Sequence, residues 1–140
     1  MKSQEQILAE LDSFYPEEHE WEALDELIEE ASYHPGKDTV KILLNVFERF
    51  PEHDGCRVFW SIVHTLEAIG DYESELVNSI QRQPHEMSVL MLNRLINGGF
   101  REIDGKPITD ILHEIAMNNS FPNAISEKAN YFIEYQQSRT

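Results

Sequence analysis

Apolar side chains recur along this chain at intervals of three and four residues, from its first ten residues to its last fifteen. This spacing places them on one face of an α-helix, whereas a half-buried strand would show an alternation that is not convincing anywhere in the chain. Proline and glycine residues interrupt the pattern at short intervals. The pattern predicts seven or eight helices, in the segments 3–14, 17–33, 38–50, 56–69, 72–82, 85–97, 108–118 and 122–136.

Several polar residues and prolines mark the expected ends of these helices. Ser3, followed three residues later by Gln6, has the spacing of a capping box. Pro16 can open the second helix, because the first turn does not need its missing N–H. Asp38 is the expected cap of the third helix. Residues 100–107 are expected to form a loop, or a small hairpin at the Asp104-Gly105 step.

Short breaks between helices of ten to seventeen residues favour an all-α fold in which sequence neighbours pack antiparallel. Helical pairs stacked in the manner of HEAT or armadillo repeats are the expected arrangement. The pairs cannot be aligned with one another by residue identity, so a compact helical bundle remains the alternative. A length of 140 residues favours a single domain covering residues 1–140, with a strongly acidic helical segment at 1–36 and a helical core at 37–140.

The helices at 56–69 and 85–97 differ from the others, because polar side chains accompany a broad apolar surface on each. In the first, Trp60, His64 and Glu67 share a second face, so both helices are predicted to be interior. Arg94 falls among apolar positions of the second and should pair with Glu67 or Glu73, because an unpaired buried charge is costly. The residues predicted to form a structural polar core are His64, Glu67, Glu73, Asn93, Arg94 and Asn97.

Charge is concentrated at the beginning of the chain. The net charge is −15, and residues 1–36 hold eleven acids against Lys2 alone, which is −10 of that total. Such an imbalance costs self-repulsion, and attraction to a basic partner would explain it, although an acidic face that only keeps the protein in solution is the simpler alternative. The predicted partner-binding acids are Glu17, Glu18, Glu20, Glu22, Asp25, Glu26, Glu29 and Glu30. Nucleic acid and anionic membranes are disfavoured as partners by the scattered bases.

Motifs that carry catalytic chemistry are missing from the sequence. Three His-Glu pairs occur, at His19, His85 and His113, but none has the second histidine four residues on that a zinc-binding helix needs. Cys56 is the single cysteine, which fits a reducing cytoplasm. The chain has no nucleophile elbow and no phosphate-binding glycine loop. We therefore expect a cytoplasmic protein that is not an enzyme and uses no metal or cofactor.

The run from Phe59 to Glu73 and the run from Met91 to Asn97 resemble a family of small all-α immunity proteins of bacterial polymorphic toxin and contact-dependent inhibition systems. The resemblance covers roughly residues 58–117. It implies a HEAT-like helical fold and the binding of a cognate toxin domain, and it gives no reason to regard the matching residues as catalytic. They are Trp60, His64, Glu67, Tyr72, Glu73, Met91, Asn93, Arg94 and Asn97.

Two functions follow as hypotheses. In the first, the chain neutralises a cognate toxin domain with a basic surface, such as a nuclease, by protein–protein contact through its acidic face. In the second, it is a general helical-repeat adaptor that binds a basic host protein or peptide. The sequence does not indicate an oligomeric state.

Overall fold

The computed structural model describes residues 2–16 and 21–139. These residues form eight α-helices, one short 3-10 helix and one two-stranded antiparallel sheet. The elements are α1 (Gln4–Ser13), α2 (Trp21–Ser32), α3 (Lys37–Arg49), η1 (Gly55–Arg57), α4 (Val58–Ile69), α5 (Glu73–Arg82), α6 (Glu86–Asn97), β1 (Glu102–Ile103), β2 (Lys106–Pro107), α7 (Ile108–Met117) and α8 (Asn123–Ser138).

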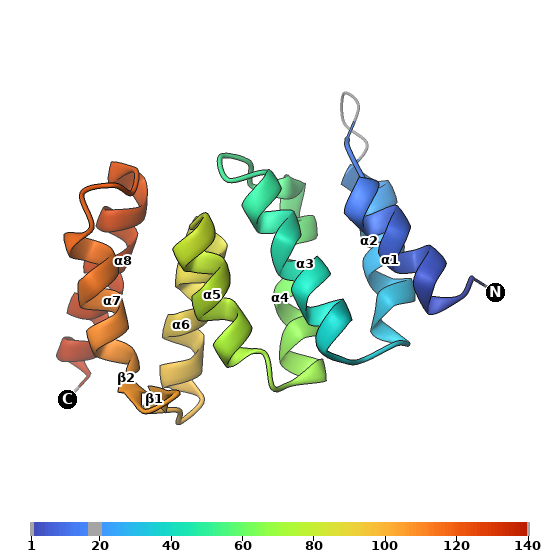
Figure 1. Cartoon of the computed structure of the whole chain (residues 1–140). Coiled ribbons are helices and arrows are strands. Elements are labelled where there is room, and N and C mark those ends of the chain that lie inside the picture. The colour runs from blue at the N-terminus through green and yellow to red at the C-terminus, as the bar shows by residue number, and fades with distance from the viewer. Residues whose placement is uncertain (1, 17–20, 140) are drawn as a thin grey trace.

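The helices are arranged as four pairs that stand side by side (Figure 1). Each odd-numbered helix packs on the even-numbered helix that follows it, and the odd-numbered and even-numbered helices form two layers. Within the even-numbered layer, α2 packs on α4, α4 on α6 and α6 on α8. The prediction of an all-α fold built from packed helical pairs is confirmed.

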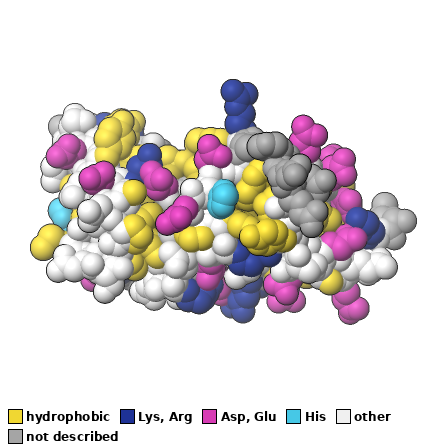
Figure 2. Space-filling view, turned by 90° about the horizontal axis from the view of Figure 1, so that it is seen from above, with side chains coloured by type: hydrophobic (Ala, Val, Ile, Leu, Met, Phe, Trp, Pro, Cys, Tyr) yellow, Lys and Arg dark blue, Asp and Glu magenta, His cyan; other side chains and the backbone are white. Residues whose placement is uncertain are grey.

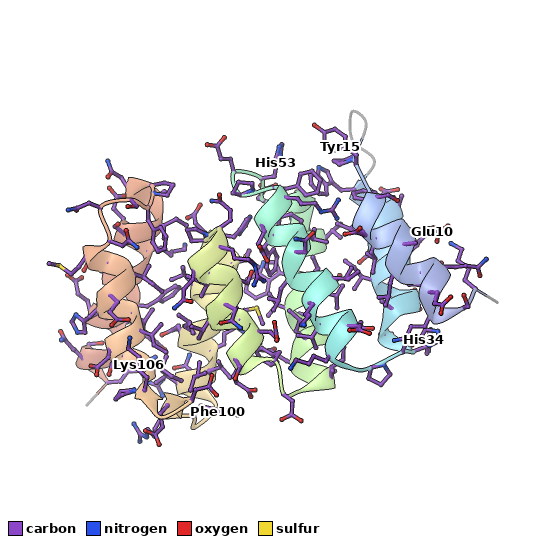
Figure 3. All side chains as sticks on the ribbon, viewed as in Figure 1. Glu10, Tyr15, His34, His53, Phe100 and Lys106 are labelled. Atoms are coloured by element: carbon purple, nitrogen blue, oxygen red, sulfur yellow. The ribbon has the colours of Figure 1, made fainter. Side chains whose placement is uncertain are left out.

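The connections between helices gather at two opposite edges of the array. Tyr15 and His53 lie at one edge, and His34, Phe100 and Lys106 lie at the other (Figure 3). The expected hairpin is present, because Glu102 pairs with Pro107 and Ile103 with Lys106 around the Asp104-Gly105 step. Surface connections of this kind are where functional side chains are often presented.

An aromatic cluster lies in the core beneath the edge that carries His53. The buried ring of Phe59 on α4 meets Trp21 on α2 with centroids 5.4 Å apart, and Phe47 on α3 at 5.2 Å. His85, at the start of α6, also lies 5.2 Å from Phe59. Because these rings come from four helices, the cluster ties the two layers together. Trp21 itself is buried, at 7% exposure.

Two predicted helix caps have different outcomes. The capping box at α1 is present, since Gln6 N–H donates to Ser3 Oγ at 3.2 Å and Ser3 N–H donates to Gln6 Oε1 at 2.9 Å. The prediction of Asp38 as a cap is wrong, because α3 begins at Lys37 and its cap position is Gly36. Asp38 lies in the first turn, where a carboxylate favours the positive end of the helix dipole.

The last turn of α1 is capped by a side chain from α3. The Arg49 guanidinium donates from Nη1 to the Phe14 carbonyl at 2.8 Å and from Nη2 to the Leu11 carbonyl at 2.6 Å. The Leu11 carbonyl also accepts from Phe14 N–H at 3.3 Å, and both carbonyls lie at the helix end, where the regular helical hydrogen bonds stop. Arg49 therefore holds α1 against α3.

His85 closes the first turn of α6 with its ring. Its Nδ1 accepts from Met87 N–H at 2.9 Å, so Nδ1 carries no proton and the Nε2–H donates to the His53 carbonyl at 2.7 Å. The ring is almost completely buried, and burial lowers the pKa of His85 below its usual value. The neutral imidazole thus links α6 to the loop between α3 and α4.

This arrangement predicts a loss of stability in mild acid. The unfolded chain binds a proton at His85 near the ordinary pKa of about 6.5, whereas the folded chain binds it only at lower pH, so the free energy of unfolding falls as pH drops below about 6.5. Asparagine can cap a helix but does not titrate there. Denaturant unfolding from pH 7.5 to 5.5 should therefore show a flatter profile for His85→Asn than for the parent, at a lower overall stability. Parallel profiles would contradict the assigned role of His85.

Candidate protein-interaction surface

The outward face of α2 carries a row of carboxylates. The predicted acids Glu17, Glu18 and Glu20 lie outside the described residues, so the structure places only the remaining five. Four of these are exposed at a spacing of three and four residues, opposite the buried face of the helix. We call them the acidic stripe: Glu22, Asp25, Glu26 and Glu29.

No lysine, arginine or histidine within residues 2–16 and 21–139 forms an ion pair with the acidic stripe. Glu30 is different, because Lys2 Nζ approaches it at 3.5 Å while pairing with Glu10 at 2.8 Å. Figure 2 shows acidic side chains gathered over the end of the molecule that α1 and α2 form. Apart from the contacts of Lys2 with Glu10 and Glu30, this end therefore presents negative charge that no ion pair among the described residues neutralises.

A second group of polar side chains spans α4 and α6. Arg94 Nε donates to Glu67 Oε2 at 2.7 Å and Nη2 donates to Oε1 at 2.8 Å, so the predicted pairing of Arg94 is confirmed with Glu67 as the partner. The same guanidinium lies over the Trp60 ring, 5.6 Å from its centroid. The pairing lowers the pKa of Glu67, chiefly through the hydrogen bonds from Arg94. Arg94 is thus satisfied by an acid and an aromatic ring together.

The other residues of the predicted polar core differ in burial. Asn93 is buried and its Oδ1 accepts from Gln136 Nε2 on α8 at 2.6 Å, while Glu73 is half-buried. The interior position predicted for His64 and Asn97 is wrong, because both side chains are exposed. Their helices lie in the even-numbered layer, which packs against helices on one side and leaves the opposite side to solvent.

Tyr72 lies beside the Glu67–Arg94 pair at the start of α5. Burial raises the pKa of Tyr72 to about 12, and the negative charges of Glu67 and Glu73 act in the same direction. The phenol therefore stays protonated at neutral pH. With Phe100 and Leu95, these residues line a groove of about 230 Å³ at the edge that carries the hairpin.

A larger groove of about 290 Å³ lies at the opposite edge of the same two helices, and we call it the Trp60 groove. Its apolar surface comes from Trp60 of α4 with Met87 and Leu90 of α6. The remaining lining residues are polar or charged: Glu52, His53, Asp54, His85, Glu86 and Lys128. Trp60 is 40% exposed, which is unusual for a tryptophan in a folded protein unless it contacts something.

His53 connects the Trp60 groove with the start of the acidic stripe. Its ring lies 5.7 Å from Trp21, the residue immediately before Glu22, and its side chain also lines the groove. The groove and the first turn of α2, where the stripe begins, therefore lie near the edge that His53 marks in Figure 3.

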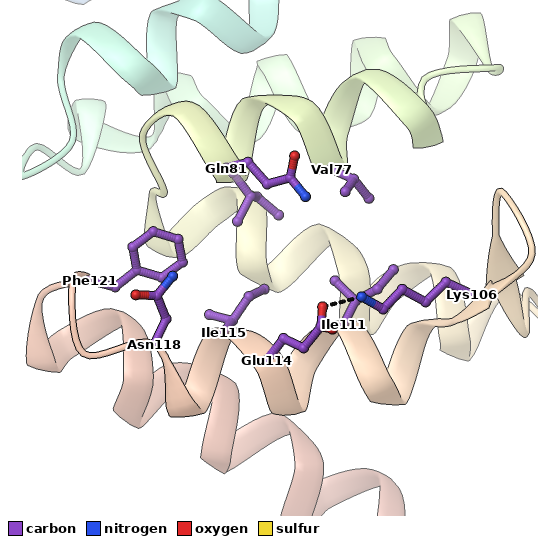
Figure 4. Close-up of a pocket in the computed structure, with 9 residues that line it drawn as sticks. Val77, Gln81, Lys106, Ile111, Glu114, Ile115, Asn118 and Phe121 are labelled. Atoms are coloured by element: carbon purple, nitrogen blue, oxygen red, sulfur yellow. Dashed lines mark hydrogen bonds and ion pairs between the residues drawn. The ribbon is translucent and has the colours of Figure 1, made fainter.

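A further cavity of about 160 Å³ lies between α5 and α7, which pack less closely than the other neighbours in their layer (Figure 4). Val77, Ile111 and Ile115 supply apolar surface, and the ion pair between Lys106 and Glu114 lies at one end. This cavity is on the odd-numbered layer, whereas the acidic stripe and Trp60 are on the even-numbered layer. It is not part of the surface described above.

The described part of the chain holds neither a metal-binding cluster nor a membrane-spanning helix. No group of three or more His, Cys, Asp or Glu side chains there has the arrangement needed to hold a metal ion. No helix there has both the length and the apolar character required to cross a lipid bilayer.

Comparison of the chain with protein-family models, with curated proteins and with solved structures finds no match. Membership of the immunity family thus stays a prediction from the resemblance.

Sequence reasoning missed the Trp60 groove, because it placed Trp60 between helices. A signal was present, since Trp60 and His64 lie one helical turn apart and away from the apolar arc of α4. The contributions of Glu52 from a loop and Lys128 from α8 had no such signal, because only the folded chain brings them to the groove.

Proposed function

We propose that this chain is an immunity protein that neutralises a cognate bacterial toxin domain by binding it, without catalysis and without a cofactor. The proposed partner is a toxin domain with a basic surface, such as a nuclease whose substrate cleft attracts phosphate groups. The observation that carries the proposal is the acidic stripe, in which four exposed carboxylates project together with no ion pair among the described residues. Complementary charge raises association rates and discourages acidic competitors.

The physical cost of the stripe supports a role beyond solubility. Glu29 lies in the last turn of α2, at the end of the helix where the dipole disfavours a negative charge. A face that only maintained solubility would be served equally well by mixed charges, which avoid this repulsion. Attraction to a positively charged protein offsets the cost when the partner binds.

The alternative function is that of a helical adaptor for a basic host protein or peptide. The Trp60 groove favours it, because an apolar groove with a charged rim suits the recognition of one exposed side chain. Both functions use the same surface, and they differ in the identity of the partner.

Co-expression separates them. The reading frame beside the gene should encode a long secreted protein with a toxic C-terminal domain, and cells producing that domain should survive only when this chain is present. A matched strain producing the toxin with an unrelated acidic helical protein should die. Death despite the chain, or survival without it, would end the immunity proposal and leave the adaptor.

A further inference from the structure

The Trp60 groove has the size and the lining to bind one side chain of a partner. Its volume of about 290 Å³ lies just below the range of about 300–1,000 Å³ typical of sites for drug-sized molecules. Trp60, Met87 and Leu90 form an apolar surface along which the methylene groups of a long side chain can lie. A long, unbranched side chain therefore fits better than a bulky ligand.

Charge at the rim favours a cation. Three carboxylates, those of Glu52, Asp54 and Glu86, line the groove against the single ammonium of Lys128. Lys128 Nζ lies 3.9 Å from Glu86, whose side chain is exposed while that of Lys128 is half-buried, so water partly screens this long contact and a stronger ligand can displace it. His85 adds no positive charge, because its Nδ1 accepts a hydrogen bond from the backbone.

The chain already builds one arginine site beside this groove. The Arg94 guanidinium lies over the indole of Trp60 and forms a bidentate pair with Glu67, which combines stacking on an aromatic ring with charged hydrogen bonds. Arg94 lines the neighbouring groove, whereas Trp60 lines this one. The indole thus offers the Trp60 groove the same chemistry: an aromatic surface with carboxylates nearby.

We infer that the Trp60 groove binds an arginine side chain of a basic protein partner, with the guanidinium against Trp60 and the carboxylates of Glu52 and Glu86. This inference rests on the proposed function for the basic character of the partner, and it adds the point of attachment. The acidic stripe attracts the partner over a distance, and the groove then anchors it. The two are near each other because His53 lines the groove and also contacts Trp21 at the start of α2. Arginine suits the site better than lysine, because its planar guanidinium can stack on the indole ring and donate two parallel hydrogen bonds to a carboxylate.

The test uses N-acetyl-arginine N-methylamide as the probe and the indole N–H resonances of the intact protein as the readout. The chain has two tryptophans, and buried Trp21 serves as an internal reference for exposed Trp60. We expect the Trp60 resonance to shift in a saturable way while that of Trp21 stays nearly constant. The citrulline derivative, which has the same shape without the charge, should cause no shift, and the lysine derivative should bind more weakly.

Variants locate the binding on the groove. Trp60→Ala should lower the affinity for the arginine derivative by about tenfold, read from the shifts of Met87 and Leu90 amides, and Trp60→Phe by less. Glu52→Gln combined with Glu86→Gln should weaken binding by a similar factor. The matched control, Glu5→Gln combined with Glu102→Gln, removes the same charge from exposed positions outside the groove and should leave the affinity unchanged.

Three results would overturn the inference: the absence of a saturable shift, an equal response to the citrulline derivative, or an equal response to the lysine derivative. The titration is repeated with the acidic stripe neutralised (Glu22→Gln, Asp25→Asn, Glu26→Gln and Glu29→Gln), so that long-range attraction does not imitate binding in the groove. The outcome is independent of the co-expression test. Protection of cells by Trp60→Ala at parental level would remove the groove from the interface without removing the proposed function.

Discussion

Replacing Gly55 with alanine is expected to destabilise the fold by about 2–5 kcal/mol, as the sum of a backbone penalty and an overpacked core. Gly55 has a φ of +67°, a left-handed conformation that L side chains disfavour. A Cβ atom there would lie 2.4 Å from the Phe59 ring, which is closer than real Cβ contacts. Phe59 is fully buried among Trp21, Phe47 and His85, so its ring has no room to retreat.

Gly105→Ala is the matched control, because Gly105 in the two-residue hairpin loop has a positive φ of +81° and no atom within 4 Å of an added Cβ. It should cost only the backbone penalty of about 1–2 kcal/mol. Denaturant unfolding of the two variants isolates the effect of the contact with Phe59. Equal losses of stability would show that the aromatic cluster tolerates the added methyl group and that the packing around Phe59 is looser than described.

Reversing the charge of the acidic stripe is expected to slow association with the proposed basic toxin domain by about 100-fold or more at low salt. Replacing Glu22, Asp25, Glu26 and Glu29 by lysine changes the net charge by +8 and turns attraction into repulsion. Electrostatic steering raises association rates by about 10–10³-fold, and it weakens as salt increases. Stopped-flow association between 20 and 300 mM salt should show a rate that falls with salt for the parent and no longer falls for the variant.

Folding should be unaffected by this reversal, because all four side chains are exposed and none has an ion pair among the described residues. Circular dichroism and denaturant unfolding check that requirement. A matched variant changes the net charge by the same +8 through lysine at four exposed acids away from the stripe, namely Glu102, Asp110, Glu127 and Glu134, and tests whether net charge alone is responsible. An unchanged rate for the stripe variant, or an equal fall for the control, would place the interface elsewhere on the molecule.

Local signals in the sequence were sufficient for most helices of the fold. The capping box at Ser3 and the step at Asp104-Gly105 act over a few residues, so they can be predicted without the tertiary structure. The wrong prediction of Asp38 as the cap of α3 has a physical reason. The helix begins two residues earlier, with Val40 N–H donating to the Gly36 carbonyl, and the hydroxyl of Thr39 donates to the His34 carbonyl.

The candidate surface was predicted less completely than the fold. The acidic stripe could be found from the sequence, because its acids fill one side of an amphipathic helix. The exposure of Trp60 was signalled only in part, since a helical wheel separates Trp60 from the apolar arc of α4 but does not show whether a neighbouring helix covers it. No local sequence pattern predicts that Lys128 and Glu52, which are far apart in the sequence, line the same groove.

The contacts that hold the first helical pair to the second leave the outer face of α2 open to substitution. Arg49 of α3 holds the C-terminal end of α1. The exposed carboxylates on the outer side of α2 make no ion pair among the described residues, so they do not contribute to packing between the pairs. Substitutions there can change which proteins are attracted while the interior stays as it is. Under the proposed function, binding specificity could therefore diverge through single substitutions of surface carboxylates, while the packing between the helical pairs is retained.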